Sequence, residues 1–206
     1  MMKTLKISEA VVRRLPLYLR YLNRLMNMNV RTVSSQQLGD GLDLNPAQIR
    51  KDLACFGEFG RKGIGYEVDY LIAKIKNILK LDQQINVVLI GAGHLGYAIS
   101  NYNAYLKDNM RIVAILDTDP AKVGKQTAGI EIQPLERLEK VVEEKNIRVG
   151  IIAVPAEAAQ AVADALVRVG ISAILNFAPI NLRVADGVRV HYADVTMELY
   201  SLAYYL

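Results

Sequence analysis

The feature that most constrains the fold is a glycine-rich turn between an apolar run and a helical segment. Residues 85–90, Ile-Asn-Val-Val-Leu-Ile, have the length and composition of a buried strand, and Gly-Ala-Gly-His-Leu-Gly follows at once. This spacing is the dinucleotide-binding fingerprint, in which the first glycine permits a tight turn, the second admits a pyrophosphate and the third allows helix and strand to pack closely. The phosphates are expected at the helix N-terminus. The predicted loop residues are Gly91, Ala92, Gly93, His94, Leu95 and Gly96.

An acidic residue at the end of the next predicted strand specifies the ligand further. The segment 111–116 ends in Asp117, 21 residues beyond Gly96. An acid at this place accepts hydrogen bonds from ribose hydroxyls, and no arginine follows immediately to hold a 2′-phosphate, so NAD(H) is favoured over NADP(H). Asp119 is the alternative acid, and Asp117 also fits a capping or turn role.

The alternation of elements continues to the end of the sheet. Helices expected at 97–106, 134–144 and 156–169 alternate with strands at 149–154 and 171–175, which favours a Rossmann-like α/β domain with a parallel sheet. Ligands in such sheets bind beyond the carboxyl ends of the strands. Two proline-containing segments lie there, and each fits either a pocket for the nicotinamide half of the cofactor or an ordinary loop. These candidates are Val154, Pro155, Asn176, Phe177, Ala178 and Pro179.

Charge is divided unevenly along the chain. Residues 1–80 hold 14 Lys/Arg against 7 Asp/Glu, whereas residues 81–206 hold 11 against 14. Such asymmetry indicates that the N-terminal part meets a polyanion, although a solvated basic face gives the same balance.

Three helices are expected in that basic part. Apolar residues at spacings of three and four predict a helix over 8–28, which Pro16 kinks or splits. A serine and a glutamine at capping-box spacing within 34–37 begin a short second helix, and the glycines within 39–41 end it. The Asn-Pro pair at 45–46 begins a third helix, since asparagine caps well and proline suits the first helical position.

Two short helices joined by a tight turn match a helix-turn-helix, whose second helix enters the major groove. Arg50 and Lys51 are expected to reach guanine edges or phosphates, Gln48 to pair with adenine, and Asp52 to face outward with them. The glycine-rich segment 57–66 is expected to form the hairpin of a winged helix; the alternative is a small helical bundle with a charged face. The predicted DNA contacts are Arg13, Arg14, Ser34, Ser35, Asn45, Gln48, Arg50, Lys51, Arg61 and Lys62.

The two ends of the second domain have their own signals. After a helix expected over 69–81, the polar segment 82–84 is the candidate linker. At the C-terminus, Asp194 is expected to cap a helix over 195–206 whose apolar stripe is too rich to stay exposed. This helix is expected to pack either on its own domain or on a second subunit.

The residue inventory argues against catalysis and against metal binding. The chain has two histidines and one cysteine, with no nucleophile–base set and no metal-spaced cluster, so the cofactor is expected to be sensed rather than consumed. No signal-peptide-like stretch is present, and the apolar runs are far shorter than the roughly 20 residues of a membrane span, which favours the cytoplasm.

The sequence closely resembles the Rex family of redox-sensing transcriptional repressors. The resemblance covers nearly the whole chain, and the glycine loop is part of it. The other matching segments are 8–16, 45–53, 56–60, 63–66, 151–159 and 174–179. Cys55, where serine or tyrosine is expected, is one small departure.

The resemblance implies a homodimer on palindromic double-stranded operator DNA that leaves the DNA when NADH replaces NAD⁺. It implies a winged-helix domain over 1–81, a Rossmann-like domain over 82–192 and a swapped C-terminal helix over 193–206. It also implies a link between domains, which falls by position on Arg20, Tyr102 and Asp194.

Two other classes of protein remain as alternatives at this stage. One is a small NAD-dependent dehydrogenase with a basic N-terminal extension, and the other is a CoA- or nucleotide-binding module of a larger complex.

The basis of nicotinamide selectivity also stays open. An apolar pocket near Phe177 penalises the oxidised, cationic ring by desolvation, whereas stacked terminal tyrosines favour it.

Overall fold

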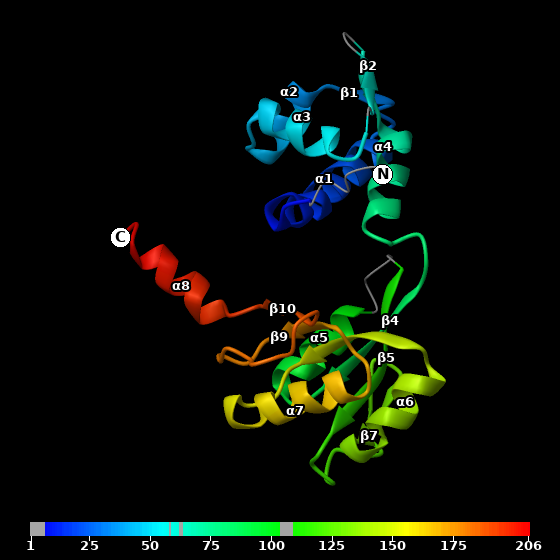
Figure 1. Cartoon of the computed structure of the whole chain (residues 1–206), viewed down its shortest axis with the longest axis vertical. Coiled ribbons are helices and arrows are strands. Elements are labelled where there is room, and N and C mark those ends of the chain that lie inside the picture. The colour runs from blue at the N-terminus through cyan, green and yellow to red at the C-terminus, as the bar shows by residue number, and fades with distance from the viewer. Residues whose placement is uncertain (1–6, 58, 62–63, 104–108) are drawn as a thin grey trace. The chain divides into compact units, whose positions relative to one another are not determined.

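The computed structural model describes residues 7–57, 59–61, 64–103 and 109–206 (Figure 1). The chain divides into two compact units, residues 1–82 and 83–206. Each unit has a hydrophobic core of its own.

The first helix, α1 (Glu9–Asn27), begins where its capping residue predicts. The Ser8 hydroxyl accepts a hydrogen bond from the amide of Val11, and Pro16 lies inside the helix without splitting it. Buried residues such as Leu15 and Leu22 stand on both sides of the proline, so packing against the core holds the two halves in one helix.

The second helix, α2 (Ser35–Leu42), has the predicted capping box, in which Ser34 and Gln37 bond reciprocally. The prediction that its glycines end it is wrong, because α2 continues through Gly41 to Leu42 and ends at Asp43, which takes the left-handed conformation. Gly39 serves packing instead, since a Cβ there would strike the Leu44 carbonyl and the ring of Pro46.

The third helix, α3 (Pro46–Ala54), is capped by Asn45, whose side chain accepts from the Ala47 amide at 2.8 Å. A three-stranded antiparallel sheet and α4 (Val68–Ile78) complete the unit, with strand order β1-β3-β2. The strands are β1 (Thr32–Val33), β2 (Gly60–Arg61) and β3 (Gly65–Glu67). Three helices followed by a small hairpin are the winged-helix arrangement that the sequence predicts.

The second unit is built on a seven-stranded sheet of order β10-β9-β8-β4-β5-β7-β6, parallel except where β6 meets β7. The strands are β4 (Ile85–Ile90), β5 (Met110–Asp117), β6 (Gln126–Thr127), β7 (Ile130–Pro134), β8 (Ile147–Ile152), β9 (Ala173–Asn176) and β10 (Arg189–Tyr192). The helices are α5 (His94–Asn103), α6 (Leu138–Glu144), α7 (Ala156–Arg168) and α8 (Val195–Ala203), with a 3₁₀ turn at Leu135–Arg137.

The helices cover the two faces of this sheet unequally. On one face α6 and α7 pack over alternate residues of the strands, as in a Rossmann-like fold. On the other face α5 contacts β4, β5 and β6, while Ile151 of β8 and Leu175 of β9 line an open apolar pocket. The uncovered half of this face is therefore a candidate contact surface.

Several predicted boundaries in this unit are wrong. The helix expected over 134–144 is preceded by strand β7 and a 3₁₀ turn, and α6 begins only at Leu138. Isoleucines at 130 and 132 already show the two-residue period of a strand, but the run is too short to stand out. Strand β10 is mostly exposed and therefore has no apolar signal. Helix α5 begins at His94 rather than at Tyr97.

Candidate functional site

The glycine loop between β4 and α5 has the geometry that its spacing predicts. Gly91 has a φ of +102°, and a Cβ there would strike the Ala153 carbonyl oxygen. A Cβ on Gly96 would strike the Gly91 carbonyl, so this glycine allows the helix to begin tightly against the strand. Gly93 faces open space, where an added Cβ would meet no other atom within 4 Å. The loop is therefore closed at its first and third glycines and open to a ligand at the second.

Asp117 lies at the end of β5 with 7% of its surface exposed. Its Oδ2 accepts from the Ala92 amide at 2.7 Å and from Lys122 Nζ at 3.1 Å, and its Oδ1 accepts from the Asp119 amide at 2.8 Å. Burial alone raises the pKa of this carboxyl, but the hydrogen bonds and the Lys122 charge outweigh burial and hold the pKa below its usual value. Asp117 is thus an anion that ties the glycine loop to the end of β5.

Lys122 was not identified from the sequence. Its ammonium lies 3.6 Å from the Asp119 carboxylate as well as beside Asp117, and the bond to Asp117 is the main cause of its raised pKa. The only available signal was a lysine five residues after the strand-end acid. The acidic edge of the site is therefore partly neutralised within the chain.

A pocket of about 330 Å³ opens between these elements. Five of the predicted site residues line it, namely Gly91, Gly93, Asp117, Val154 and Pro155. Ala92, His94, Leu95, Gly96, Asn176, Ala178 and Pro179 do not line it. Phe177 lines a different pocket, described below.

Asn176 has a local structural role in the loop after β9. It is fully buried, its amide nitrogen donates to the carbonyl of Ala178 at 2.9 Å, and its amide oxygen accepts from the Ala178 amide at 3.0 Å. A further bond to the Ile180 carbonyl uses the remaining donor. These bonds shape the loop rather than leave a group free for a ligand.

A second pocket, of about 490 Å³, lies on the sheet face that α5 leaves half covered. Its walls are apolar, with Val87, Ile151 and Leu175 from the strands and Ile99 from α5. Tyr102 and Phe177, which were predicted on separate grounds, both line it.

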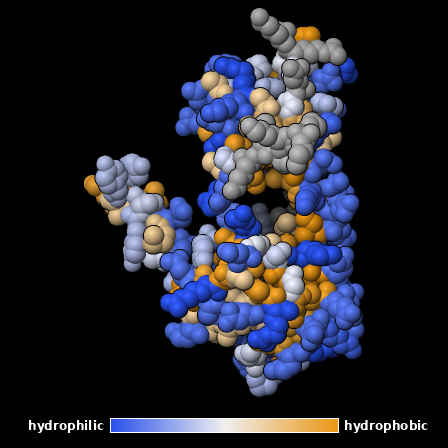
Figure 2. Space-filling view, in the orientation of Figure 1, coloured by the Kyte–Doolittle hydropathy of each residue, from blue (hydrophilic) through white to orange (hydrophobic). Residues whose placement is uncertain are grey.

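Helix α8 begins at the predicted cap, since Asp194 Oδ1 accepts from the amides of Thr196 and Met197 at 2.9 and 3.3 Å. It does not pack on its own domain. The exposed fractions of Leu199, Leu202 and Tyr204 are 60%, 59% and 87%. Figure 2 shows hydrophobic residues at the surface of this helix, among residues of intermediate hydropathy. Of the two expected locations, packing within its own domain is therefore excluded.

The outer side of α3 carries the basic side chains that were predicted. Arg50 and Lys51 are exposed, and Arg50 Nη1 donates to the Ser35 hydroxyl at 2.9 Å. Arg13 is also exposed and pairs with Glu9 at 2.7 Å. Arg20 is exposed too. Ser34 and Asn45 serve as helix caps.

The wing is described only in part. The backbone of Arg61 belongs to β2, but its side chain is not described, and Lys62 lies outside the described residues.

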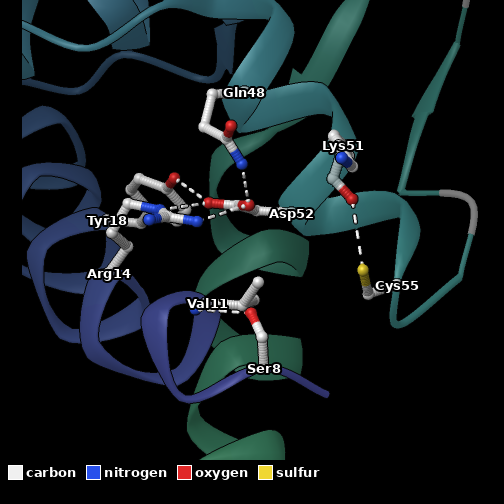
Figure 3. Close-up of polar contacts among 8 residues, drawn as sticks. All are labelled: Ser8, Val11, Arg14, Tyr18, Gln48, Lys51, Asp52 and Cys55. Atoms are coloured by element: carbon white, nitrogen blue, oxygen red, sulfur yellow. Dashed lines mark hydrogen bonds and ion pairs between the residues drawn. The ribbon is translucent and has the colours of Figure 1, made fainter. Parts of the chain in front are cut away.

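Asp52 departs from the prediction, because it faces Arg14 inside the unit (Figure 3). Asp52 is fully buried rather than outward. Arg14 donates from Nε to Oδ2 at 2.6 Å and from Nη2 to Oδ1 at 2.8 Å, while the Tyr18 hydroxyl and Gln48 Nε2 each donate to the same carboxylate at 2.6 Å. The Arg14 guanidinium is thus held by this ion pair, and 23% of the side chain stays exposed, so its contact with DNA stays a prediction.

The electrostatics of this cluster follow from its contacts. Burial alone raises the pKa of the Asp52 carboxyl, but the bonds from Arg14, Tyr18 and Gln48 outweigh burial and lower it. The bond to Asp52 raises the pKa of Arg14, and burial followed by the same carboxylate raises that of Tyr18. The cluster therefore keeps one anion and one cation over the physiological range.

Among the described residues, no group of three or more His, Cys, Asp or Glu side chains could hold a metal ion. None of the described helices is both long and apolar enough to cross a membrane.

Comparison with known proteins accounts for both units. A family model described as CoA binding domain matches residues 82–180, and one described as putative DNA-binding protein N-terminus matches residues 6–54. The redox-sensing transcriptional repressor Rex of Brevibacillus brevis is 66% identical over the full length of both chains. This chain belongs to the Rex family. The Rex repressor of Desulforamulus reducens is 47% identical, over 100% of this Rex chain and 98% of its own.

Solved structures of a Rex-family repressor, RSP, have the same fold. RSP in complex with β-NAD⁺ and operator DNA has a TM-score of 0.91 and 39% identity, covering 97% of this chain and 92% of that one. RSP in complex with β-NADH has a TM-score of 0.87 and 38% identity, covering 97% and 94%. The family resemblance and the order of a DNA-binding domain before a Rossmann-like domain are thus confirmed. The relatives are named as repressors rather than as enzymes.

Proposed function

We propose that this Rex-family chain binds operator DNA as a repressor and leaves it when NADH takes the place of NAD⁺. The observation that carries the proposal is the presence, on one chain, of an exposed basic third helix in a winged-helix unit and an open glycine-loop pocket in a Rossmann-like unit. RSP, which is similar over 97% of this chain, forms complexes with operator DNA and with both redox forms of the dinucleotide.

On the DNA side, α3 enters the major groove. Arg50 and Lys51 point outward from it and contact guanine edges or phosphates. Arg61 and Lys62 of the wing contact the backbone or the minor groove, and the caps at Ser34 and Asn45 bring helix N-termini toward phosphates. The winged-helix domain, residues 1–81, supplies all of these contacts.

On the dinucleotide side, the NAD(H) pyrophosphate lies against the open Gly93 and the N-terminus of α5. The ribose lies toward Asp117, whose carboxylate is ionised and already fixed by the loop. Lys122 offsets part of the negative charge at this edge, and Val154 and Pro155 line the route toward the nicotinamide. This domain spans residues 82–192.

The active form is a homodimer in the cytoplasm on a palindromic operator. The apolar stripe of α8 is not covered within its own unit, so the C-terminal segment over residues 193–206, which contains α8, inserts into the partner subunit. Arg20, Tyr102 and Asp194 couple the units, and Tyr102 and Asp194 both lie next to apolar surface that a second subunit would cover.

A fluorescence-anisotropy titration on a labelled operator, selected from random DNA by the full chain, tests the proposal. Specific binding that NADH abolishes and NAD⁺ does not is the expected result. Equal sensitivity to the two dinucleotides, or no sequence-specific binding, would refute it. Turnover of NADH with a small substrate and no operator binding would instead favour a dehydrogenase.

A further inference from the structure

Gln48, on the helix proposed to face DNA, has a fixed hydrogen-bonding direction. We propose that Asp52 locks the Gln48 amide so that its oxygen accepts from an exocyclic amino group of adenine or cytosine in the major groove. Gln48 is then a determinant of operator sequence, and Asp52 is the positioning residue behind it. This inference rests on the proposed DNA-binding function and specifies the chemistry of its contact.

The orientation of the Gln48 amide is fixed by the chemistry of its partner, the Asp52 carboxylate. Gln48 Nε2 donates to Asp52 Oδ1 at 2.6 Å, one helical turn along α3. An ionised carboxylate can only accept, so the opposite orientation of the amide would set its oxygen against the Asp52 oxygen. The orientation of most glutamine amides is ambiguous, but here an acceptor-only neighbour decides it.

The position of that neighbour is itself fixed from α1. Arg14 donates hydrogen bonds to both oxygens of Asp52, and the Tyr18 hydroxyl donates to Oδ2 at 2.6 Å. Asp52 is fully buried, so water does not compete for these bonds. Figure 3 shows the amide nitrogen of Gln48 directed at this carboxylate and its oxygen directed elsewhere. A cluster that spans two helices therefore holds one surface side chain.

Two groups of the Gln48 amide remain for DNA, namely the oxygen, which can only accept, and the second Nε2 hydrogen. Within the described ranges, no group donates a hydrogen bond to Gln48 Oε1, and the side chain is half-buried at the edge of α3. In the major groove the base groups that donate are N6 of adenine and N4 of cytosine, whereas O6 and N7 of guanine, O4 of thymine and phosphate oxygens only accept. An unlocked glutamine can turn its amide to suit either kind of group. In the locked glutamine, only an amino group can satisfy the oxygen, so a guanine or thymine edge that faces this oxygen is disfavoured.

The test maps Gln48 onto single base groups of the operator. Full-length wild type and Gln48→Met, which keeps the side-chain length without the amide, are titrated against operators in which one base at a time lacks its amino or its keto group. For each operator, the affinity of wild type is divided by the affinity of Gln48→Met. Any effect of the altered base on the duplex itself is the same for both proteins and cancels in this ratio. Gln160→Met, which breaks a similar amide–carboxylate bond in the other unit, is the control.

We expect this affinity ratio to fall by about 3- to 10-fold when one particular amino group in each half-site is removed. A loss of this size corresponds to one net hydrogen bond. Removal of a keto group, which the fixed oxygen cannot contact, is not expected to replace this effect. Dependence on a keto group but on no amino group, or on no base group while wild type still selects its operator, would overturn the inference. Absence of any operator selection by wild type would refute the proposed function instead.

Asp52→Asn tests the lock separately. An asparagine can offer either an oxygen or an amide nitrogen, so Gln48 is no longer held in one orientation. We expect the dependence on the amino group to weaken in this variant, whereas Tyr18→Phe, which leaves the Gln48–Asp52 bond in place, retains it. If folded Asp52→Asn keeps the wild-type dependence, Asp52 is not the positioning residue. The wild-type and Gln48→Met map decides the base contact even if Asp52→Asn does not fold.

Discussion

Two adjacent arginines on α1 provide a sharp test of the energetics of the first unit. Arg13 pairs with Glu9 at the surface, where the two side chains are 61% and 69% exposed. Arg14 pairs with Asp52, whose side chain is fully buried, and keeps 23% of its own side chain exposed. The two residues share a helix and a charge but differ in the burial of the partner. Alanine at each position therefore separates the effect of burial from the loss of a cation.

Arg14→Ala leaves the Asp52 carboxylate buried with hydrogen bonds from Tyr18 and Gln48 only. Removing one partner of a buried ion pair typically costs about 3–5 kcal/mol, and the residual exposure of Arg14 places the expected loss near the lower end. Arg13→Ala removes an exposed pair within one helix, which is expected to cost less than about 0.5 kcal/mol. The free energy of unfolding should thus separate the two variants clearly.

Hydrogen exchange of the full chain measures this difference, because amides of α1 and α3 report the free energy of unfolding of the first unit. Amides of β4 and β8 in the second unit serve as the internal control and should be unchanged in both variants. If Arg14→Ala lowers protection of α1 and α3 no more than Arg13→Ala does, the buried pair contributes nothing and the reasoning is refuted.

Three further predictions follow from the sites. Gly93→Leu should abolish release of DNA by NADH and preserve operator affinity, because residue 93 faces open pocket space; retained release in an anisotropy titration would contradict this. Leu199→Glu with Leu202→Glu should dissociate the dimer in sedimentation experiments, since each buried anchor contributes about 2 kcal/mol. A lowered folded-state pKa means that Asp52 stabilises the first unit above pH about 4 and loses this effect as the pH falls further. Urea melts of Asp52→Asn should show less of this acid loss than those of wild type.

Features that depend on neighbours along the chain were predictable from the sequence. The caps Ser8, Ser34, Asn45 and Asp194 each bond a backbone amide two or three residues ahead, as their positions imply. The glycine loop was also predictable, because its spacing reflects a turn and a close helix–strand approach within six residues. Local chemistry specifies such features almost completely.

Features that depend on distant residues were not predictable in the same way. Asp52 contacts Arg14 and Tyr18, which lie 38 and 34 residues away in the sequence. Its place on the helix predicts an exposed side chain, because these distant partners cannot be identified from the local sequence. Strand β10 is stabilised by pairing with β9 rather than by apolar residues of its own. The apolar stripe of α8 was evident from the sequence, but nothing in a single chain specifies what covers it.

Dinucleotide binding and DNA binding are coupled in this chain, and thermodynamic linkage measures that coupling. The affinity for NADH is measured by calorimetry with the full chain alone and with saturating operator. If NADH weakens operator binding, the operator must weaken NADH binding by the same factor, about 10-fold or more for an effective switch. Equal NADH affinity with and without operator would contradict the account.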